Sequence, residues 1–393
     1  MPKKSRNRVL SFALAAILIA GFVIVASYFV IPNLVKKSYD EISFVVASTP
    51  EWIPPVVEEK KKKIAHLQTP EPLKGIYMTS WVAGTPRIRK DLVALVETTE
   101  INSIVIDIKD YTGKIAYKPN DFDLEARKTY EERITDLSAF IEELHTKNIY
   151  VIGRIAAFQD PAMIHNFPEE AVKRKSDGSV WKDYKGIAWM DPASETMWEY
   201  LVEIAEDAHA QGFDEINFDY IRFPSDGNMK DIAYPVSGDR VKREVMSEFF
   251  AYVGRKLKES DMVISADLFG LTTSASGDLN IGQVLEDALP HFDYVAPMVY
   301  PSHYPDGFNG FKNPADHPYE IIKFAMDEAV KKTEAASTTI SKIRPWLQDF
   351  DLGADYGPEE VRAQIQATND AGLTSWLLWS ASNRYTKEAL LAE

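Results

Sequence analysis

From Lys74 onward, short apolar runs rich in β-branched residues alternate with longer amphipathic stretches. Runs that are apolar along most of their length and alternate with helices are typical of parallel strands covered on both faces. The sequence therefore predicts an α/β fold, a closed (β/α)8 TIM barrel, because no glycine-rich phosphate loop follows the first run to favour a dinucleotide-binding sheet. The predicted strands are Gly75–Ser80, Ser103–Lys109, Ile149–Ile155, Glu215–Ile221, Met262–Leu268, Phe292–Val299, Ile343–Phe350 and Thr374–Ser380.

The amphipathic stretches between these runs carry the start and stop signals of helices. The clearest helix is predicted over Ser194–Ala210, where Ser194 is a typical N-cap residue and apolar side chains recur at helical spacing. Gly212 follows at the position of a C-cap glycine. Further helices are predicted over Arg240–Lys258, Pro318–Lys332 and Pro358–Asp370.

Two connections, at about 155–194 and 299–318, are longer than the others and rich in aromatic residues. Each leaves the carboxyl end of a predicted strand, which is the end where barrel enzymes build their active sites. Long ordered loops at that face are usually substrate walls, and we predict that role here. The alternative is that both are insertions without a binding role.

The N-terminal segment has the pattern of a membrane anchor. Several Lys and Arg residues precede an uncharged run from Val9 to Val35, and its apolar part is long enough to cross a hydrocarbon core of ~30 Å. The run is longer than that of a cleaved signal peptide, so we predict an uncleaved transmembrane signal anchor over residues 1–35, with a cleaved signal peptide as the alternative. The basic flank places the N-terminus in the cytoplasm. The prediction is a single-pass protein of the cell membrane with an extracytoplasmic catalytic domain.

Composition sets the domain plan and excludes several classes. Prolines and the run EEKKKK predict a linker over 36–73, which leaves 74–393 for the barrel domain. The formal net charge of −15 argues against nucleic acid as a partner, since phosphate binding needs clustered cations. The chain has no cysteine, no His-Glu-x-x-His and no Gly-x-Ser-x-Gly, so we predict no metal site, no cofactor and no serine nucleophile.

Carboxylates gather where the predicted strands end. Asp219 and Asp267 end neighbouring strands, and adjacent strands lie about 5 Å apart, so the two side chains could face one substrate. Glycoside hydrolysis needs two carboxyl groups on either side of one bond. We therefore predict Asp219 and Asp267 as the catalytic pair. Each could instead cap a helix or pair with an arginine.

Other polar and aromatic residues at the same strand ends are predicted to bind substrate. Side chains alternate along a strand, so Asp107 and Lys109 share one face, although the two could simply pair with each other. The aromatic candidates would stack on sugar rings, unless they belong to the core. The predicted substrate-binding residues are Asp107, Lys109, Arg222, Tyr300, Gln348, Trp189 and Trp379.

One string of residues resembles a known family. Ile216–Pro224 (INFDYIRFP), together with Lys74–Tyr77 and Ser265–Gly270, is similar to the bacterial putative glycosyl hydrolase domain, domain-of-unknown-function family 4015, over roughly Pro72 to the C-terminus. That group is related to the α-amylase-like glycoside hydrolase barrels. The resemblance implies a (β/α)8 fold and retaining-type chemistry, with a nucleophilic Asp at the end of the fourth strand, which Asp219 matches.

The same resemblance marks two departures from the α-amylase-like pattern. Where that pattern has a Glu acid on the fifth strand, this chain has Asp267. Where it has an Arg two residues before the nucleophile, this chain has Asn217. The function predicted from the sequence is a membrane-anchored extracytoplasmic glycoside hydrolase that cleaves a polysaccharide. The alternative is a non-catalytic glycan-binding or cell-envelope scaffold protein that uses the same cleft.

Overall fold

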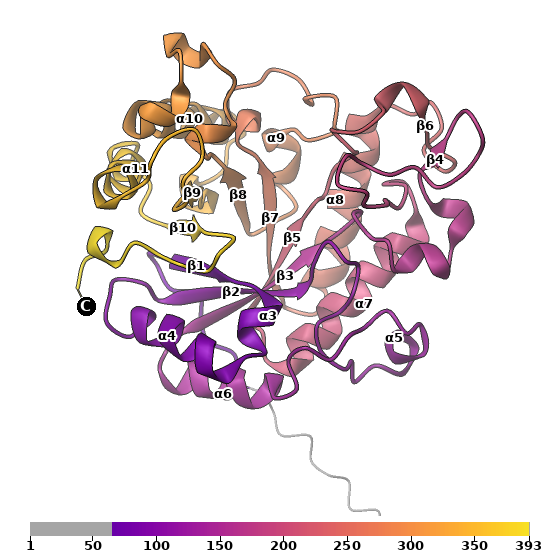
Figure 1. Cartoon of the computed structure of the whole chain (residues 1–393), viewed down its shortest axis with the longest axis horizontal. Helices are drawn as coiled ribbons and strands as arrows, with labels where there is room; N and C mark the ends of the chain where they lie inside the picture. The colour runs from indigo at the N-terminus through magenta and orange to yellow at the C-terminus, as the bar shows by residue number, and fades with distance from the viewer. Residues whose placement is uncertain (1–64, 393) are drawn as a thin grey trace, which may run out of the picture. The chain divides into compact units, whose positions relative to one another are not determined.

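The computed structural model describes residues 65–392. Eight parallel strands close into a barrel in the order β1-β10-β9-β8-β7-β5-β3-β2 (Figure 1), which confirms the predicted (β/α)8 architecture. Each strand overlaps one of the eight predicted runs. The strands are β1 (Lys74–Met78), β2 (Ser103–Lys109), β3 (Tyr150–Ala156), β5 (Glu215–Asp219), β7 (Val263–Phe269), β8 (Tyr294–Met298), β9 (Trp346–Gln348) and β10 (Trp376–Trp379).

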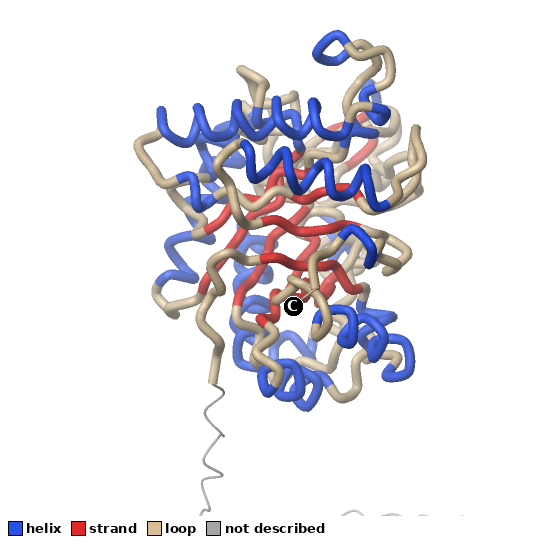
Figure 2. The backbone as a smooth tube through the Cα atoms, turned by 90° about the vertical axis from the view of Figure 1, so that its left-hand side faces the viewer, coloured by secondary structure: helices blue, strands red, loops and turns tan. Residues whose placement is uncertain are grey.

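Helices surround the strands on the outside of the barrel (Figure 2). The helix predicted after Ser194 is α7, and the Ser194 hydroxyl accepts a hydrogen bond from the Met197 amide at its start. Gly212 ends the helix with φ of 117°, a conformation that glycine adopts without strain. The helices are α3 (Ser80–Ala83), α4 (Pro86–Val96), α5 (Phe122–Ala126), α6 (Leu137–Thr146), α7 (Glu195–Gln211), α8 (Lys242–Lys258), α9 (Leu285–Ala288), α10 (Pro318–Ala335) and α11 (Pro358–Asp370).

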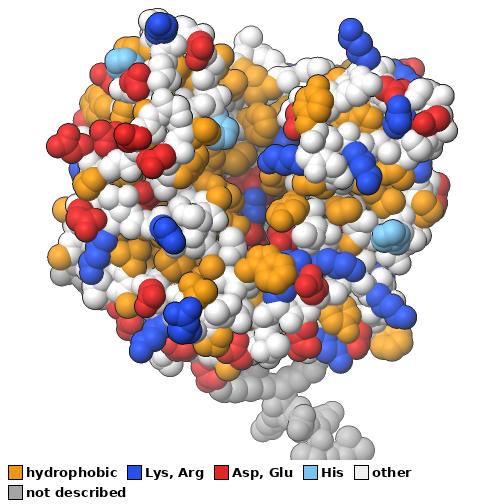
Figure 3. All heavy atoms as spheres, in the orientation of Figure 1, with side chains coloured by type: hydrophobic (Ala, Val, Ile, Leu, Met, Phe, Trp, Pro, Cys, Tyr) orange, Lys and Arg blue, Asp and Glu red, His pale blue; other side chains and the backbone are white. Residues whose placement is uncertain are grey.

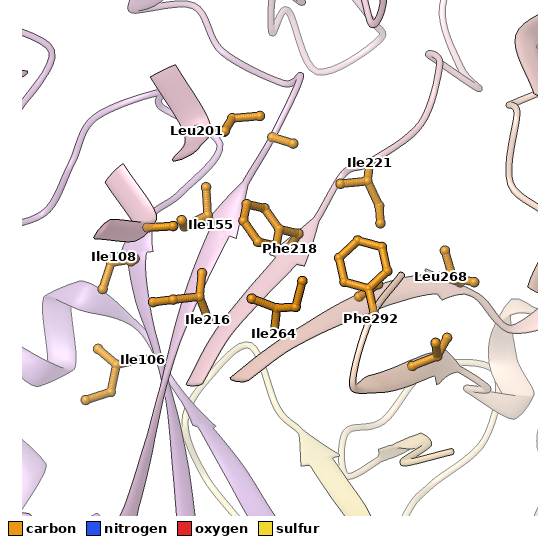
Figure 4. Packing of buried hydrophobic residues seen from close by; sticks show 14 of the residues in the cluster. Ile106, Ile108, Ile155, Leu201, Ile216, Phe218, Ile221, Ile264, Leu268 and Phe292 are labelled. Atoms are coloured by element: carbon orange, nitrogen blue, oxygen red, sulfur yellow. The ribbon is translucent and has the colours of Figure 1, made fainter. Parts of the chain in front are cut away.

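Alternation along the strands divides the core into two layers. One set of side chains, including Ile216 and Phe218 of β5, belongs to the layer that packs with helix residues such as Leu201 (Figure 4). A second, smaller cluster that includes Val105 and Ile152 fills the interior of the barrel. Successive side chains on a strand point to opposite faces. Asn217 and Asp219 of β5 therefore point into the barrel.

The chain just before β1 covers the amino-terminal end of the barrel. Leu73 is fully buried, and the Leu67 amide donates a hydrogen bond of 2.7 Å to Asp214. Thr69 and the Tyr150 hydroxyl lie 2.9 Å apart. Leu67 and Leu73, which belong to the segment predicted as a linker over 36–73, therefore pack against the barrel.

The predicted transmembrane segment, 1–35, lies outside the described residues. Among residues 65–392, no helix is both long and apolar enough to cross a membrane.

The two long connections leave the carboxyl ends of β3 and β8. The first contains β4 (Lys173–Arg174), which pairs antiparallel with β6 (Ile232–Ala233) from the connection after β5. This small sheet lies outside the barrel, beside the carboxyl end of β5 (Figure 1). The second connection, after β8, contains only short 3-10 turns before α10. Both connections supply side chains to the mouth of the barrel.

Candidate active site

A cavity of about 500 Å³ opens at the carboxyl end of the strands. Asp219 from the end of β5, Asp267 from β7 and Trp379 from the end of β10 line it. Tyr300, from the connection after β8, contributes to the wall. Figure 3 shows the hollow near the middle of this face, with acidic and basic side chains in its depth and hydrophobic ones around it. The cavity lies where barrel enzymes bind their substrates.

Arg154 of β3 lies at the centre of the site. Its guanidinium donates through Nη1 to Asp107 Oδ1 at 2.5 Å and through Nη2 to Asp219 Oδ2, and its Nε lies 3.7 Å from Asp267 Oδ2. The strand register explains this meeting, because Asp107, Arg154 and Asn217 lie side by side on β2, β3 and β5. One buried cation therefore holds three carboxyl groups, two of which face the cavity.

The backbone turns sharply just after Asp219. Tyr220 adopts φ of 53°, a left-handed conformation that costs a bulky residue about 1–3 kcal/mol. In this conformation the Tyr220 amide donates to Asp219 Oδ1 at 2.5 Å. Both oxygens of Asp219 are therefore fixed, one by the turn and one by Arg154.

Asp267 lies deeper and is 1% exposed. Its Oδ1 accepts hydrogen bonds from Asn217 Nδ2 at 2.9 Å and from Trp346 Nε1 at 2.8 Å. Burial, and then the charge of nearby Asp219, raise the pKa of Asp267 from 3.8 to about 8. Asp267 therefore keeps its proton at neutral pH. Two carboxyl groups in one cavity with different environments are typical of an acid-base pair.

Three of the predicted substrate-binding residues line the cavity: Arg222, Tyr300 and Trp379. The Trp379 ring, which lines the cavity, stacks on the Tyr77 ring with centroids 3.9 Å apart. Burial, and then the charges of Asp267 and Asp219, raise the pKa of Tyr300 well above 10, so its hydroxyl remains a neutral hydrogen-bond donor.

The other four predicted substrate-binding residues do not line the cavity; they are Asp107, Gln348, Trp189 and Lys109. Asp107 lies behind Arg154 and accepts a hydrogen bond from the Tyr77 hydroxyl. Gln348 is fully buried, and its Oε1 accepts from the backbone amide and hydroxyl of Ser302. The fully buried Trp189 donates to Asp183 at 3.0 Å, so neither face of its ring is open to a sugar.

Lys109 is the clearest correction to the sequence-based geometry. The register between β2 and β3 shifts between Asp107 and Lys109, and such a bulge re-aims the side chain that follows it. The Lys109 ammonium lies 2.9 Å from Asp160, with both side chains fully buried. Lys109 therefore pairs with Asp160 and not with the carboxylates of the mouth, and it has no access to the cavity.

Arg154, Lys185 and His303 also line the cavity but were absent from the predicted site. Arg154 had a signal in the sequence, because it is the one charged residue within Tyr150–Ala156. It stands two positions after Ile152 and so points into the barrel. Lys185 and His303 lie on the two long connections, where spacing alone does not place a side chain.

Within residues 65–392, no group of three or more His, Asp or Glu side chains is placed to hold a metal ion. The three carboxyl groups at the mouth converge on a guanidinium instead. That no cofactor takes part stays a prediction.

An acid-base pair of carboxyl groups at the mouth of a (β/α)8 barrel is the arrangement that glycoside hydrolases use. The chain belongs to the family described as the putative glycosyl hydrolase domain, whose model matches residues 75–385. This family membership confirms the resemblance found in the sequence, and it makes the chain a glycoside hydrolase. No curated protein matches it.

Solved structures resemble the fold. The PgaB (BpsB) glycoside hydrolase domain from Bordetella bronchiseptica is 14% identical, with 81% of this chain and 97% of that chain covered at a TM-score of 0.58. The C-terminal domain of a putative chitinase from Desulfitobacterium hafniense is 11% identical, with 81% and 96% covered at 0.51. A hypothetical protein from Ruminiclostridium thermocellum is 36% identical, with 49% and 96% covered at 0.44.

Proposed function

We propose that this chain cleaves glycosidic bonds of a polysaccharide with Asp219 and Asp267 as the reacting carboxyl groups. The observation that carries the proposal is the sharing of Arg154 by two carboxyl groups that face one cavity. Their environments differ, since the pKa of Asp267 is raised to about 8 while Asp219 is ion-paired at the surface of the cavity. A protonated acid and a carboxylate held by a cation are the two partners that glycoside hydrolysis requires.

In this mechanism Asp267 is the general acid and protonates the oxygen of the leaving sugar. Asp219 acts on the anomeric carbon, either directly as nucleophile or by taking a proton from the attacking water. Arg154 positions Asp219 and balances its charge. Trp379 and Tyr300 form the wall against which the sugar ring packs, and aromatic faces suit the apolar faces of sugars.

Asp219→Asn in the full-length chain tests the proposal. The amide preserves the size of the side chain and removes the charge, so release of reducing sugar from a panel of α- and β-linked envelope polysaccharides should fall by about 10²–10⁴-fold. Asp91→Asn is the matched control, because Asp91 is exposed on α4, away from the cavity. Full activity in Asp219→Asn would reject the assignment.

The same assay separates the two candidate functions. Glycan binding without release of sugar, in a folded wild-type chain, would favour the non-catalytic glycan-binding or scaffold role. Where sugar is released, proton NMR of the first product distinguishes direct attack by Asp219, which retains the anomeric configuration, from attack by water, which inverts it.

We also propose that the enzyme is anchored in the cell membrane by residues 1–35, with the barrel on the extracytoplasmic side. The support is the basic cluster followed by the long uncharged run in the sequence. External protease added to intact cells that express the full chain should digest the barrel. Protection of the barrel until the cells are lysed would contradict this topology.

A further inference from the structure

Arg222 lines the cavity but takes no part in the carboxyl network around Arg154. It is 7% exposed, and its Nη1 donates to the Phe223 carbonyl at 3.0 Å and to the Ser225 hydroxyl at 3.1 Å. Within residues 65–392, no carboxylate lies within ion-pair distance of its guanidinium, and its Nε and Nη2 make no hydrogen bond.

Aromatic rings surround this guanidinium. Its Cζ lies 4.7 Å from the centroid of Phe269, 5.0 Å from that of Trp189 and 5.4 Å from that of Tyr220. Rings stabilise a cation over their faces but give no hydrogen-bond acceptor to its N–H groups. Burial accordingly lowers the pKa of Arg222, which is the sign of a cation not fully compensated by its neighbours.

The other buried cations of the barrel are different. Arg344 pairs with Glu215 at 2.9 Å, and Lys109 pairs with Asp160 at the same distance. Arg154 contacts three carboxyl groups. Burying a charge is costly unless it is paired, so a cation without a carboxylate at the wall of a cavity is a position for an anion from outside the chain.

Lys185 provides a second cation at the same cavity. It is exposed on the connection after β3, and within the described part of the chain its ammonium has no ion-pair partner. Lys185 and His303, from the connection after β8, line the same cavity, and burial, followed by the charge of Lys185, lowers the pKa of His303. Arg154, Lys185 and Arg222 thus line a cavity whose acidic lining residues are Asp219 and the protonated Asp267.

We propose that the cavity recognises a sugar that bears a carboxylate, and that Arg222 and Lys185 bind this group. The inference rests on the proposed function, since it takes the occupant of the cavity to be a saccharide. A guanidinium with its Nε and Nη2 edge free offers the two parallel donors that fit the two oxygens of a carboxylate. A positive cavity wall is otherwise unexpected in a chain with a net charge of −15.

Two pairs of probes that differ by one carboxylate test the inference. D-glucuronate is compared with D-glucose, and N-acetylmuramic acid with N-acetylglucosamine, by titration calorimetry on the full-length chain. The first pair carries the acid at C6 and the second on a lactyl ether, so the pair that discriminates identifies the source of the carboxylate. At least one acidic sugar should bind about tenfold tighter than its neutral partner, with a preference that weakens as salt is added.

Variants link the preference to the two cations. Lys185→Gln should remove most of the preference for the acidic sugar, and this exposed position tolerates the change. Arg222→Gln should have the larger effect. Lys182→Gln is the matched control, since Lys182 is an exposed lysine of the same connection that does not line the cavity.

The outcomes separate this inference from the proposed hydrolysis. Equal affinity for acidic and neutral sugars, no measurable binding of either acid, or a preference that survives both Lys185→Gln and Arg222→Gln would overturn the acidic-sugar inference. None of these results bears on whether Asp219→Asn abolishes cleavage. A chain that prefers the acidic sugar but cleaves no polysaccharide would retain the inference and lose the hydrolase proposal.

Discussion

The barrel interior holds two buried charge networks, one at each end, and they are built differently. At the amino-terminal end, Arg344 pairs with one carboxylate, Glu215, at 2.9 Å, and the Tyr150 hydroxyl lies 3.3 Å from that same carboxylate. At the mouth, one guanidinium, that of Arg154, contacts three carboxyl groups. The first network is balanced in charge and the second is not.

This imbalance agrees with the place that we propose for the chemistry. A balanced pair can be buried with its charges satisfied, and here Arg344 is 2% and Glu215 1% exposed. Burial, and then the excess of carboxyl groups, raise the pKa of Asp267, so that this residue keeps a proton that can be donated at neutral pH. The unbalanced network opens on the cavity of about 500 Å³ at the mouth, whereas Arg344 of the balanced pair borders a smaller cavity of about 130 Å³.

The largest expected effect is on the rate of glycan cleavage, which should respond to a substitution at the mouth of the barrel and not to one at its amino-terminal end. Asp267→Asn keeps an oxygen for the Asn217 and Trp346 donors but removes the acid, so the rate of glycan cleavage should fall by about 10²–10⁴-fold. Glu215→Gln at the other end should leave the rate per folded molecule unchanged. Comparable losses in both variants, measured on protein shown to be folded by circular dichroism, would remove the distinction between the networks.

The next largest effect is on the free energy of unfolding, which should fall more for a substitution at the amino-terminal end of the barrel than for one at the mouth. Arg344→Gln leaves Glu215 buried without its cation, and it should lower the free energy of unfolding by about 3–5 kcal/mol. Adding Glu215→Gln to that variant removes the orphaned charge and should recover much of the loss. Asp267→Asn should cost far less, since Arg154 keeps two carboxylates. Urea denaturation measures all three, and an equal cost for Asp267→Asn and Arg344→Gln would contradict the contrast.

Much of this architecture could be predicted from the sequence, because it depends on local pattern. The eight strands follow from apolar runs, and α7 follows from Ser194 and Gly212 at its ends. The convergence of Asp219 and Asp267 also follows, since both point into the barrel from neighbouring strands, β5 and β7. Strand period and strand order are sufficient to bring these carboxyl groups to one mouth.

The partner of the carboxyl groups could not be predicted in the same way. Strict alternation puts Lys109 on the same face as Asp107, but the bulge after Asp107 directs Lys109 toward Asp160 and leaves Arg154 as the central cation. A bulge depends on how two strands pair, which a single strand does not encode. The burial of Trp189 was equally hidden, because it depends on how the connection after β3 folds back on itself.

A further effect should appear as pH dependence. The pKa of Asp267 is raised in the folded state, so between about pH 3.8 and about pH 8 the folded chain holds a proton that the unfolded chain has released. Stability from this group should therefore fall as pH rises through that window, by at most roughly 1.4 kcal/mol per pH unit. Cleavage should also decline as pH rises through about 8, where the acid loses its proton.

Asp267→Asn isolates this contribution, since the amide does not titrate. The difference in the free energy of unfolding between Asp267→Asn and wild type should grow in favour of the variant from acidic to mildly alkaline pH. Glu215→Gln serves as the control from the other end of the barrel. A wild-type stability that follows that of Asp267→Asn in parallel at every pH would show that Asp267 does not hold its proton in the folded state.

The smallest effect compares two tyrosine hydroxyls. Tyr300 lines the cavity, so Tyr300→Phe removes one neutral donor from the wall and should lower the ratio kcat/KM by a factor that corresponds to about 0.5–1.5 kcal/mol. Tyr150 lies at the covered end, hydrogen-bonded to Thr69, so Tyr150→Phe should cost a similar free energy of unfolding and leave kcat/KM unchanged. If Tyr150→Phe instead lowered kcat/KM as much as Tyr300→Phe, the two ends of the barrel would be coupled, and the separation between a structural network and a catalytic one would fail.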